Sequence, residues 1–309
     1  KRQMQSNKKI INFSAMTVYA GLLIFFFVVL LSDVKITTEA FSNIFNLNNF
    51  LDVNNLAPLL TVAGTIFAYF SILIISFGDF SRYVKNEQEL KKGNLSLILN
   101  LIIFSFLSVF IVIGSDVFLN QKFSDIDRIF TNPTDIVGKF DNIQITIVVL
   151  FFIIIASAST NLVANFIPSQ YSLINFAPSI LSLKSASYLI AFFGLLIAIF
   201  WLTILSQIGI LSFVDTFGAF FGPLFGVMAA DYYLIKNQEL SNKDLYSIDK
   251  ESAYYYSGGW HIKGVYSLIL GFIFSASTIW NTNLMFLQSY AWIIGAFVAW
   301  ITYYLLAKK

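Results

Sequence analysis

The chain has 309 residues, of which 57% are hydrophobic and only 12% charged, and its mean hydropathy is +0.75. A soluble domain carries about 25% charged residues, so this composition excludes a soluble globular protein and predicts an all-α, polytopic membrane protein embedded in a lipid bilayer. The net charge of +2 gives no sign of a nucleic-acid partner, and a chain with no cysteine and one histidine, His261, excludes thiol chemistry and a histidine metal cluster.

Eight apolar stretches are long enough to cross the hydrocarbon core of a membrane. They run approximately over residues 10–32, 57–78, 94–118, 143–167, 186–206, 209–235, 264–282 and 285–306. Lysine and arginine gather in alternate connections, beginning with the basic N-terminus and ending with the basic tail. The positive-inside rule therefore predicts a multi-pass protein of the plasma (inner) membrane with both termini of the chain in the cytoplasm.

The second stretch places Gly64 between Thr61 and Thr65, and Tyr69 and Phe70 follow. Glycine among small hydroxyl residues is commonly a site where another helix packs closely. Alternatively, the helix breaks here and its freed backbone lines a binding site, as in many secondary transporters. In that case the aromatic pair would offer a planar ligand a stacking surface.

The fourth stretch contains the segment "IIIASASTNLVAN" at residues 153–165. Helical spacing puts Ser157, Asn161 and Asn165 on one face, with Thr160 beside them. Lipid cannot be the neighbour of this face, because an unpaired amide in hydrocarbon costs several kcal/mol. The polar groups either bond within and between helices or line a cavity, and their density favours the cavity.

Two kinds of ligand suit this face. The hydroxyls of Ser159 and Thr160 and the carbonyl of Ala156, one turn earlier, are hard neutral oxygens of the type that hold Na⁺. The carboxamide of Asn165 both donates and accepts, so it matches the N–H/C=O edge of a cyclic amide or nucleobase.

The sixth stretch holds Gly218, Gly222 and Gly226 at four-residue spacing, with Pro223 among them. The glycines predict the close approach of another helix, and the proline predicts a kink. This pattern is chiefly structural, although a kinked helix beside a cavity can also flex as a gate.

Several acids lie within or at the ends of spans. Asp215 is a candidate for proton coupling, because an intramembrane carboxylate is usually functional, but it also lies shallow enough to reach lipid headgroups. Asp79 with Arg82, and Asp231, are expected at cytoplasmic helix ends, where ion pairs would anchor the adjoining loops.

Three segments together resemble one family, the nucleobase–cation symporters, which include cytosine, uracil, allantoin and hydantoin permeases. The segments are "GDFSRYVK" at 78–85, "ASASTNLVANFIPSQYSLINFAPSIL" at 156–181 and "GPLFGVMAADYYLIKNQELSNKDLY" at 222–246. They resemble the end of that family's sixth helix, its eighth helix with the following loop, and its tenth helix with the following loop. In this order and spacing the resemblance covers essentially the whole chain.

The resemblance implies a twelve-helix protein with the inverted-repeat fold of the LeuT type, of which this chain would hold helices five to twelve and lack the first four. Residues 1–309 are then expected to form a single transmembrane domain. Within it, 10–32 would be the last helix of the first repeat, 57–235 the five helices of the second repeat, and 264–306 the two C-terminal helices. The absent helices would complete the binding site, so the isolated chain is expected not to transport.

The resemblance also implies roles for individual residues. The substrate ring would stack on Phe70, with Tyr69 adjacent, and hydrogen-bond to Asn165, with Asn161 on the same face as a further substrate contact. The sodium site would fall on Ala156, Ser159 and Thr160, and the gate near Val214.

The sequence therefore predicts a secondary transporter, and no enzyme, that imports a nucleobase or related cyclic ureide with Na⁺ or H⁺. The coupling ion is the only cofactor expected. The alternatives are a transporter of the same fold for an amino acid or a vitamin-precursor pyrimidine, and an inactive truncated fragment. An ion channel would need a pore-lining filter and an intramembrane enzyme a catalytic constellation, and neither pattern is evident in the sequence.

Overall fold

The computed structural model describes residues 2–32, 56–122, 143–201, 210–247 and 249–308, together with residues 34, 35, 38, 42, 52 and 54. The chain divides into two compact units. The first unit consists of Lys1–Asp52 and Ser81–Ile190, and the second of Val53–Phe80 and Ala191–Lys309. The fold of each unit is described by itself.

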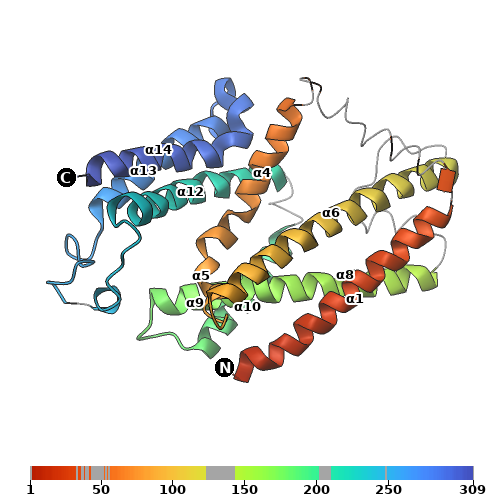
Figure 1. The fold of residues 1–309 in the computed structure, drawn as a ribbon, viewed down its shortest axis with the longest axis horizontal. Coiled ribbons are helices and arrows are strands. Elements are labelled where there is room, and N and C mark those ends of the chain that lie inside the picture. Colours follow the sequence, from red (N-terminus) through yellow and green to blue (C-terminus); the bar gives the residue numbers. More distant parts are fainter. Residues whose placement is uncertain are drawn as a thin grey trace. The chain divides into compact units, whose positions relative to one another are not determined.

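The first unit is built from long apolar helices. They are α1 (Arg2–Ser32), α6 (Glu87–Lys122), α8 (Ile143–Thr160), the π-helix η2 (Asn161–Phe166), α9 (Ile167–Phe176) and the beginning of α10 (Leu183–Phe200). Helix α1 packs against both α6 and α8 (Figure 1).

Aromatic and polar contacts join α1 to α6. The Tyr19 hydroxyl donates to Asn100 Oδ1 at 2.6 Å, and the rings of Phe26 and Phe110 lie 4.5 Å apart. This hydrogen bond gives each of the two polar side chains a partner between two apolar helices. The aromatic contact adds apolar burial beside it.

Helix α6 begins seven residues before the predicted start of its span. Asn86 caps it, because its Oδ1 accepts the Glu89 backbone N–H at 2.9 Å, and Glu87 pairs with Lys91 one turn further on. Asparagine is a favoured N-cap, and acidic residues in the first turn complement the helix dipole. The first charged turns therefore belong to the helix and not, as predicted, to the preceding loop.

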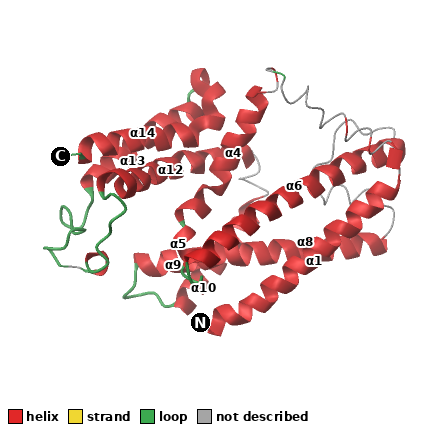
Figure 2. Ribbon diagram, in the orientation of Figure 1, coloured by secondary structure: helices red, strands yellow, loops and turns green. Residues whose placement is uncertain are grey.

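The second unit contains the remaining helices. They are α4 (Leu56–Ile75), the short α5 (Phe77–Ser81), α12 (Ile210–Ala230), the π-helix η4 (Asp231–Ile235), the 3₁₀ turn η5 (Asp244–Tyr246), α13 (Ile262–Trp280), the 3₁₀-helix η6 (Thr282–Tyr290) and α14 (Ala291–Ala307). Helices α12, α13 and α14 pack against one another, and an irregular loop connects η4 to α13 (Figure 2).

The glycine pattern of α12 brings α14 into backbone contact. A Cβ at Gly222 would overlap the carbonyl oxygen of Trp292, and one at Gly226 would overlap that of Ala296. Close approach at these glycines is confirmed. Gly64 packs in the same way on the backbone of Ser289, and α4 runs unbroken through it, so the alternative of a helix break at Gly64 is wrong.

Seven helices among the described residues are long and apolar enough to cross a membrane, and α1 carries a shorter apolar stretch, Asn12–Phe27. These eight elements correspond to the eight predicted spans. The end of the span predicted at 186–206, the start of the one at 209–235 and the connection between 122 and 143 lie outside the described residues.

Candidate functional site

The polar residues of the fourth predicted span lie where an α-helix changes into a π-helix. Helix α8 ends at Thr160, η2 covers Asn161–Phe166, and α9 begins at Ile167. The Ile167 N–H donates to the carbonyl of Leu162, five residues earlier. Pro168 has no N–H to give, so the Ala164 carbonyl lacks the donor, four residues later, that an α-helix would supply. Single π-helical turns inside α-helices occur frequently at functional sites.

The predicted polar face forms a short chain of hydrogen bonds along the helix. Asn161 Nδ2 donates to the carbonyl of Ser157 at 2.9 Å, and Asn165 Nδ2 donates to Asn161 Oδ1 at 2.6 Å. Both asparagines are exposed in the structure. All these bonds span four residues of the same helical run, so the spare hydrogen-bonding capacity of Asn165 is directed away from its own helix.

The three residues predicted to hold a cation lie on one turn of α8. The Ser159 hydroxyl donates to the carbonyl of Ala156, and the two oxygens are 3.0 Å apart. Thr160 follows as the last residue of the helix and is exposed. A carbonyl and two hydroxyls on one turn form a neutral set of hard oxygens close enough together for one small cation to contact several of them.

The other predicted site residues belong to the second unit. Tyr69 and Phe70 lie on α4 with 64% and 37% of their surfaces exposed, and their rings form an edge-to-face pair at 5.2 Å. Val214 of α12 is half-buried and packs on the cluster that contains Ala68 and Trp292. The structure thus groups the asparagines with the hydroxyl residues in one unit, and the aromatic pair with Val214 in the other.

Asp215 is buried beside Val214. It is 4% exposed, and its Oδ2 accepts a hydrogen bond from Gln288 Nε2 of η6 at 2.9 Å. The carboxylate is therefore covered by protein and has an amide as its partner, and its depth in the membrane stays a prediction. The proton-coupling alternative stays a prediction.

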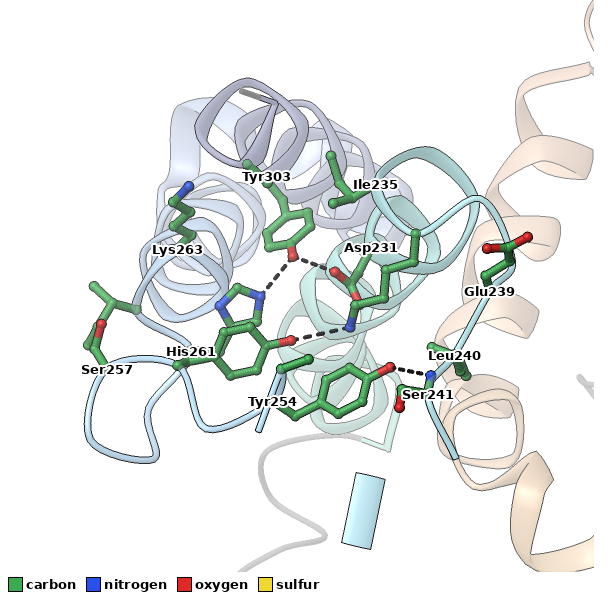
Figure 3. A pocket seen from close by; sticks show the side chains of 15 residues that line it. Asp231, Ile235, Glu239, Leu240, Ser241, Tyr254, Ser257, His261, Lys263 and Tyr303 are labelled. Atoms are coloured by element: carbon green, nitrogen blue, oxygen red, sulfur yellow. Dashed lines mark hydrogen bonds and ion pairs between the residues drawn. The ribbon is translucent and has the colours of Figure 1, made fainter. Parts of the chain in front are cut away.

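A second polar region surrounds a pocket of about 670 Å³ where α12 and α14 end, beside the loop that precedes α13 (Figure 3). Asp231 Oδ2 pairs with Lys236 Nζ at 2.7 Å, which is the loop-anchoring ion pair predicted for Asp231. Tyr303 donates its hydroxyl proton to Asp231 Oδ1 at 2.6 Å, and His261 Nε2 lies 2.7 Å from the same hydroxyl. Because that hydroxyl has one proton and gives it to the carboxylate, His261 must donate from Nε2.

Aromatic rings complete this region. His261 stacks on Tyr256 with ring centroids 3.9 Å apart, and Lys236 donates to the Tyr256 hydroxyl at 3.2 Å and lies over the Tyr254 ring at 4.3 Å. Burial lowers the pKa of Lys236, but its bonds to Asp231 and Tyr256 outweigh burial and hold the pKa above its ordinary value. We call Asp231, Lys236, Tyr256, His261 and Tyr303 the Asp231 network.

Sequence reasoning missed most of this network. Only the ion pair at Asp231 was expected. Tyr303 lies within a predicted span and His261 in a predicted loop, and neither position indicated a polar partner. Their partners lie 72 and 42 residues away along the chain. The one available signal was an acid followed by a lysine at the end of a span, which predicts a pair but not its tyrosine and histidine neighbours.

A family described as "Permease for cytosine/purines, uracil, thiamine, allantoin" matches residues 3–304. The chain belongs to this permease family. The prediction of a nucleobase–cation symporter is thereby confirmed at the level of the family, and the chain is a multi-pass membrane protein. The family and its named members are transport proteins and not enzymes, as the sequence predicted.

Two relatives show how much of a permease the chain represents. It is 28% identical over 244 residues to an allantoin permease of Bacillus subtilis (strain 168), covering 79% of this chain and 48% of that protein. It is 25% identical over 255 residues to a purine-uracil permease of Arabidopsis thaliana, covering 78% and 41%. The chain therefore spans about half the length of the relatives it matches.

Among solved structures, the inward-facing conformation of Mhp1 aligns with 96% of this chain and 74% of that chain, at a TM-score of 0.47 and 18% identity.

Proposed function

We propose that the protein carrying these residues is a secondary transporter that moves a nucleobase or related cyclic ureide across the membrane together with a cation. The observation that carries the proposal is the polar stretch, residues 156–165, in which carboxamides and hydroxyls gather at an α-to-π transition of an otherwise apolar span. Family membership supports the class of transporter, and the names of the two relatives, allantoin and purine-uracil permeases, support the class of substrate.

In this proposal Asn165 binds the substrate edge. Its Nδ2 gives one N–H to Asn161, so its Oδ1 and its second N–H are available to a ligand. A cyclic ureide offers N–H and C=O groups side by side, which complement an acceptor and a donor of one amide. Phe70 and Tyr69 would supply the stacking surface, and their exposure is consistent with that role.

The cation would be held by Ala156, Ser159 and Thr160. The 3.0 Å separation of the Ala156 and Ser159 oxygens fits ligands that converge on one ion, and no carboxylate is needed because several neutral oxygens suit Na⁺. When bound there, Na⁺ supplies a positive charge that favours the substrate-binding arrangement of the helix. Because the two sites share one helix, binding at one would raise affinity at the other by the same factor.

The proposed architecture is the LeuT-type inverted repeat implied for the family, with cytoplasmic termini and with Val214 at the gate. The half-buried position of Val214 on α12, packed on the Trp292 cluster, supports a role in a segment that covers a site. Alternating access would then change the exposure of the polar stretch from one side of the membrane to the other.

Equilibrium binding of labelled uracil and allantoin to the purified natural protein tests the proposal. Asn165→Ala should weaken binding at least about 10-fold, since it removes two hydrogen bonds worth roughly 1 kcal/mol each. The matched control is Asn100→Ala, which removes an amide that bonds Tyr19 and Ser96 and should leave affinity unchanged. Equal affinities for Asn165→Ala and the unaltered protein would refute the site, and no binding of either ligand by the unaltered protein would refute the substrate class.

A further inference from the structure

We propose that Asn161 is a positioning residue that fixes the orientation of the Asn165 amide, with Nδ2 toward Asn161 and Oδ1 toward the ligand. This orientation selects ligands with a ring N–H. The inference rests on the proposed function and gives Asn161 a role different from the substrate contact that the sequence predicted. It follows from the direction of two consecutive hydrogen bonds in the first turn of η2 and the last turn of α8.

The first bond sets the orientation of the Asn161 side chain. A backbone carbonyl can only accept, so the Asn161 atom that lies 2.9 Å from the Ser157 oxygen must be the donor, Nδ2. The carboxamide plane then directs Oδ1 the opposite way, toward Asn165. The usual ambiguity in assigning the oxygen and nitrogen of an asparagine is therefore removed by the partner.

The second bond passes this orientation to Asn165. Asn161 Oδ1 is an acceptor, so the Asn165 atom 2.6 Å away must again be Nδ2. If the Asn165 amide rotated by half a turn, two carbonyl oxygens would meet at that distance, and their repulsion disfavours the rotated form. The Ser157 carbonyl thus determines the orientation of the Asn161 amide, and the Asn161 amide determines the orientation of the Asn165 amide.

The consequence is a fixed pattern offered to a ligand. Asn165 is exposed, and among the residues that the structure describes Asn161 is its sole hydrogen-bond partner. Its Oδ1 is therefore held as an acceptor in one direction. A ligand must bring an N–H to that oxygen, and a ligand with only methylated nitrogens would leave it unpaired, which is more costly than losing a bond between two exposed groups.

The experiment compares affinities for pairs of ligands in the purified natural protein. The pairs are uracil with 1,3-dimethyluracil and hydantoin with 1,3-dimethylhydantoin, and the readout is the ratio of the two dissociation constants. Asn161→Ala releases Asn165 to rotate, and its ratio should shrink by up to about 10-fold, the upper end of the range for one neutral hydrogen bond. Asn161→Gln keeps an amide that can donate to the Ser157 carbonyl and accept from Asn165 Nδ2, so its ratio should lie closer to that of the unaltered protein than to that of Asn161→Ala.

Each outcome decides the inference. A ratio unchanged in Asn161→Ala overturns it, and so does an equal loss in Asn161→Ala and Asn161→Gln, because an amide at this position would then not restore the orientation of Asn165. Complete loss of binding in a folded Asn161→Ala also overturns it in favour of direct contact. Asn161→Ser, whose hydroxyl is too short to reach Asn165, replaces Asn161→Ala if the latter does not fold. If the unaltered protein binds none of the four ligands, the proposed function itself fails.

Discussion

The polar stretch of the first unit and the Asp231 network of the second differ in where their hydrogen-bond partners come from. In the polar stretch, Asn161, Asn165 and Ser159 bond to groups three or four residues away on the same helical run. In the Asp231 network, partners come from η4 and the lysine that follows it, from the loop before α13 and from α14, and every member is held by at least two contacts.

This difference is what we expect if the polar stretch binds a ligand and the Asp231 network stabilises the fold. Local bonds orient a side chain without using all its donors and acceptors, so the polar stretch keeps capacity for a ligand. Bonds between distant elements use that capacity to hold the fold, and breaking them leaves polar groups unpaired. Changes in the polar stretch should therefore alter binding more than stability, and changes in the Asp231 network should do the reverse.

The largest effect on stability is expected where helices touch through their backbones. Gly226→Ala places a methyl group on the Ala296 carbonyl and should lower the free energy of unfolding by about 3 kcal/mol through overpacking. The matched control, Gly194→Ala, has no atom within 4 Å of the new methyl group and should be neutral or slightly stabilising, because alanine favours the helix. The midpoint of thermal unfolding in detergent measures both, and equal midpoints would contradict the close packing.

Removing the acid of the Asp231 network should come next. Asp231→Ala leaves Lys236 and the Tyr303 hydroxyl without their acceptor and should cost about 2 kcal/mol of stability, with ligand affinity unchanged. Glu87→Ala breaks an ion pair of similar length, 2.8 Å, whose side chains are about three-quarters exposed, and should leave the unfolding midpoint almost unchanged because solvent screens the pair. A drop in ligand affinity in Asp231→Ala at unchanged stability would reverse the roles of the two regions.

The next expected effect is smaller and concerns cation binding instead of stability. Ser159→Ala removes one proposed oxygen ligand and should raise the Na⁺ concentration for half-maximal stimulation of ligand binding by roughly 10-fold, the equivalent of about 1.4 kcal/mol. Ser157→Ala, two residues earlier, keeps all three proposed ligands and serves as the control. A sodium response that is identical in both variants would remove Ser159 from the cation site, and a proton response in its place would favour H⁺ as the coupling ion.

The smallest effect is a dependence on pH. Burial lowers the pKa of His261, Asp231 opposes this shift, and Lys236 and Lys263 add to it, while Tyr256 and Tyr303 flank the ring. A folded-state pKa below the unfolded value means that the folded state binds fewer protons there. The contribution to stability is therefore present above the unfolded pKa, near 6.5, and declines as the pH falls below it.

Thermal unfolding between pH 7.5 and pH 5 measures this decline. His261→Gln keeps a side-chain N–H for Tyr303 but cannot titrate in this range, so its unfolding midpoint should fall less on acidification than that of the unaltered protein. Parallel curves for the two proteins would show that His261 does not carry the pH dependence.

The sequence predicted the helical framework because apolar length and helical periodicity are local properties. All eight predicted stretches coincide with helices in the described residues, and the spacing of Gly222 and Gly226 correctly predicted a close helix neighbour. The boundaries were less accurate where charged residues continue a helix, as at Glu87 of α6. Hydropathy also did not indicate that the last span begins as the 3₁₀-helix η6, because the same residues have the same hydropathy in a 3₁₀-helix and in an α-helix.

The sequence predicted the polar row that carries the proposed site, but not the backbone on which the row lies. Helical spacing correctly joined Ser157, Asn161 and Asn165 into one row. The π-helix that carries Asn161 and Asn165 was not foreseen, although Pro168 gives a physical reason for it, since a missing N–H disturbs the regular ladder. Contacts between distant segments, such as His261 with Tyr303, leave no periodic trace and could not be predicted from one sequence.

The central claim, that the polar stretch faces an aqueous chamber which a ligand enters, can be tested with one cysteine. The chain contains no native cysteine, and Ser157→Cys places a thiol of similar size on the row of Asn161 and Asn165. Thiols react as thiolates, which form in water and not in hydrocarbon. We predict that a membrane-impermeant thiosulfonate modifies this cysteine and that saturating uracil or allantoin slows the reaction at least about 10-fold, the value of occupying nine-tenths of the sites. No modification, or modification at a rate indifferent to every ligand, would contradict the account.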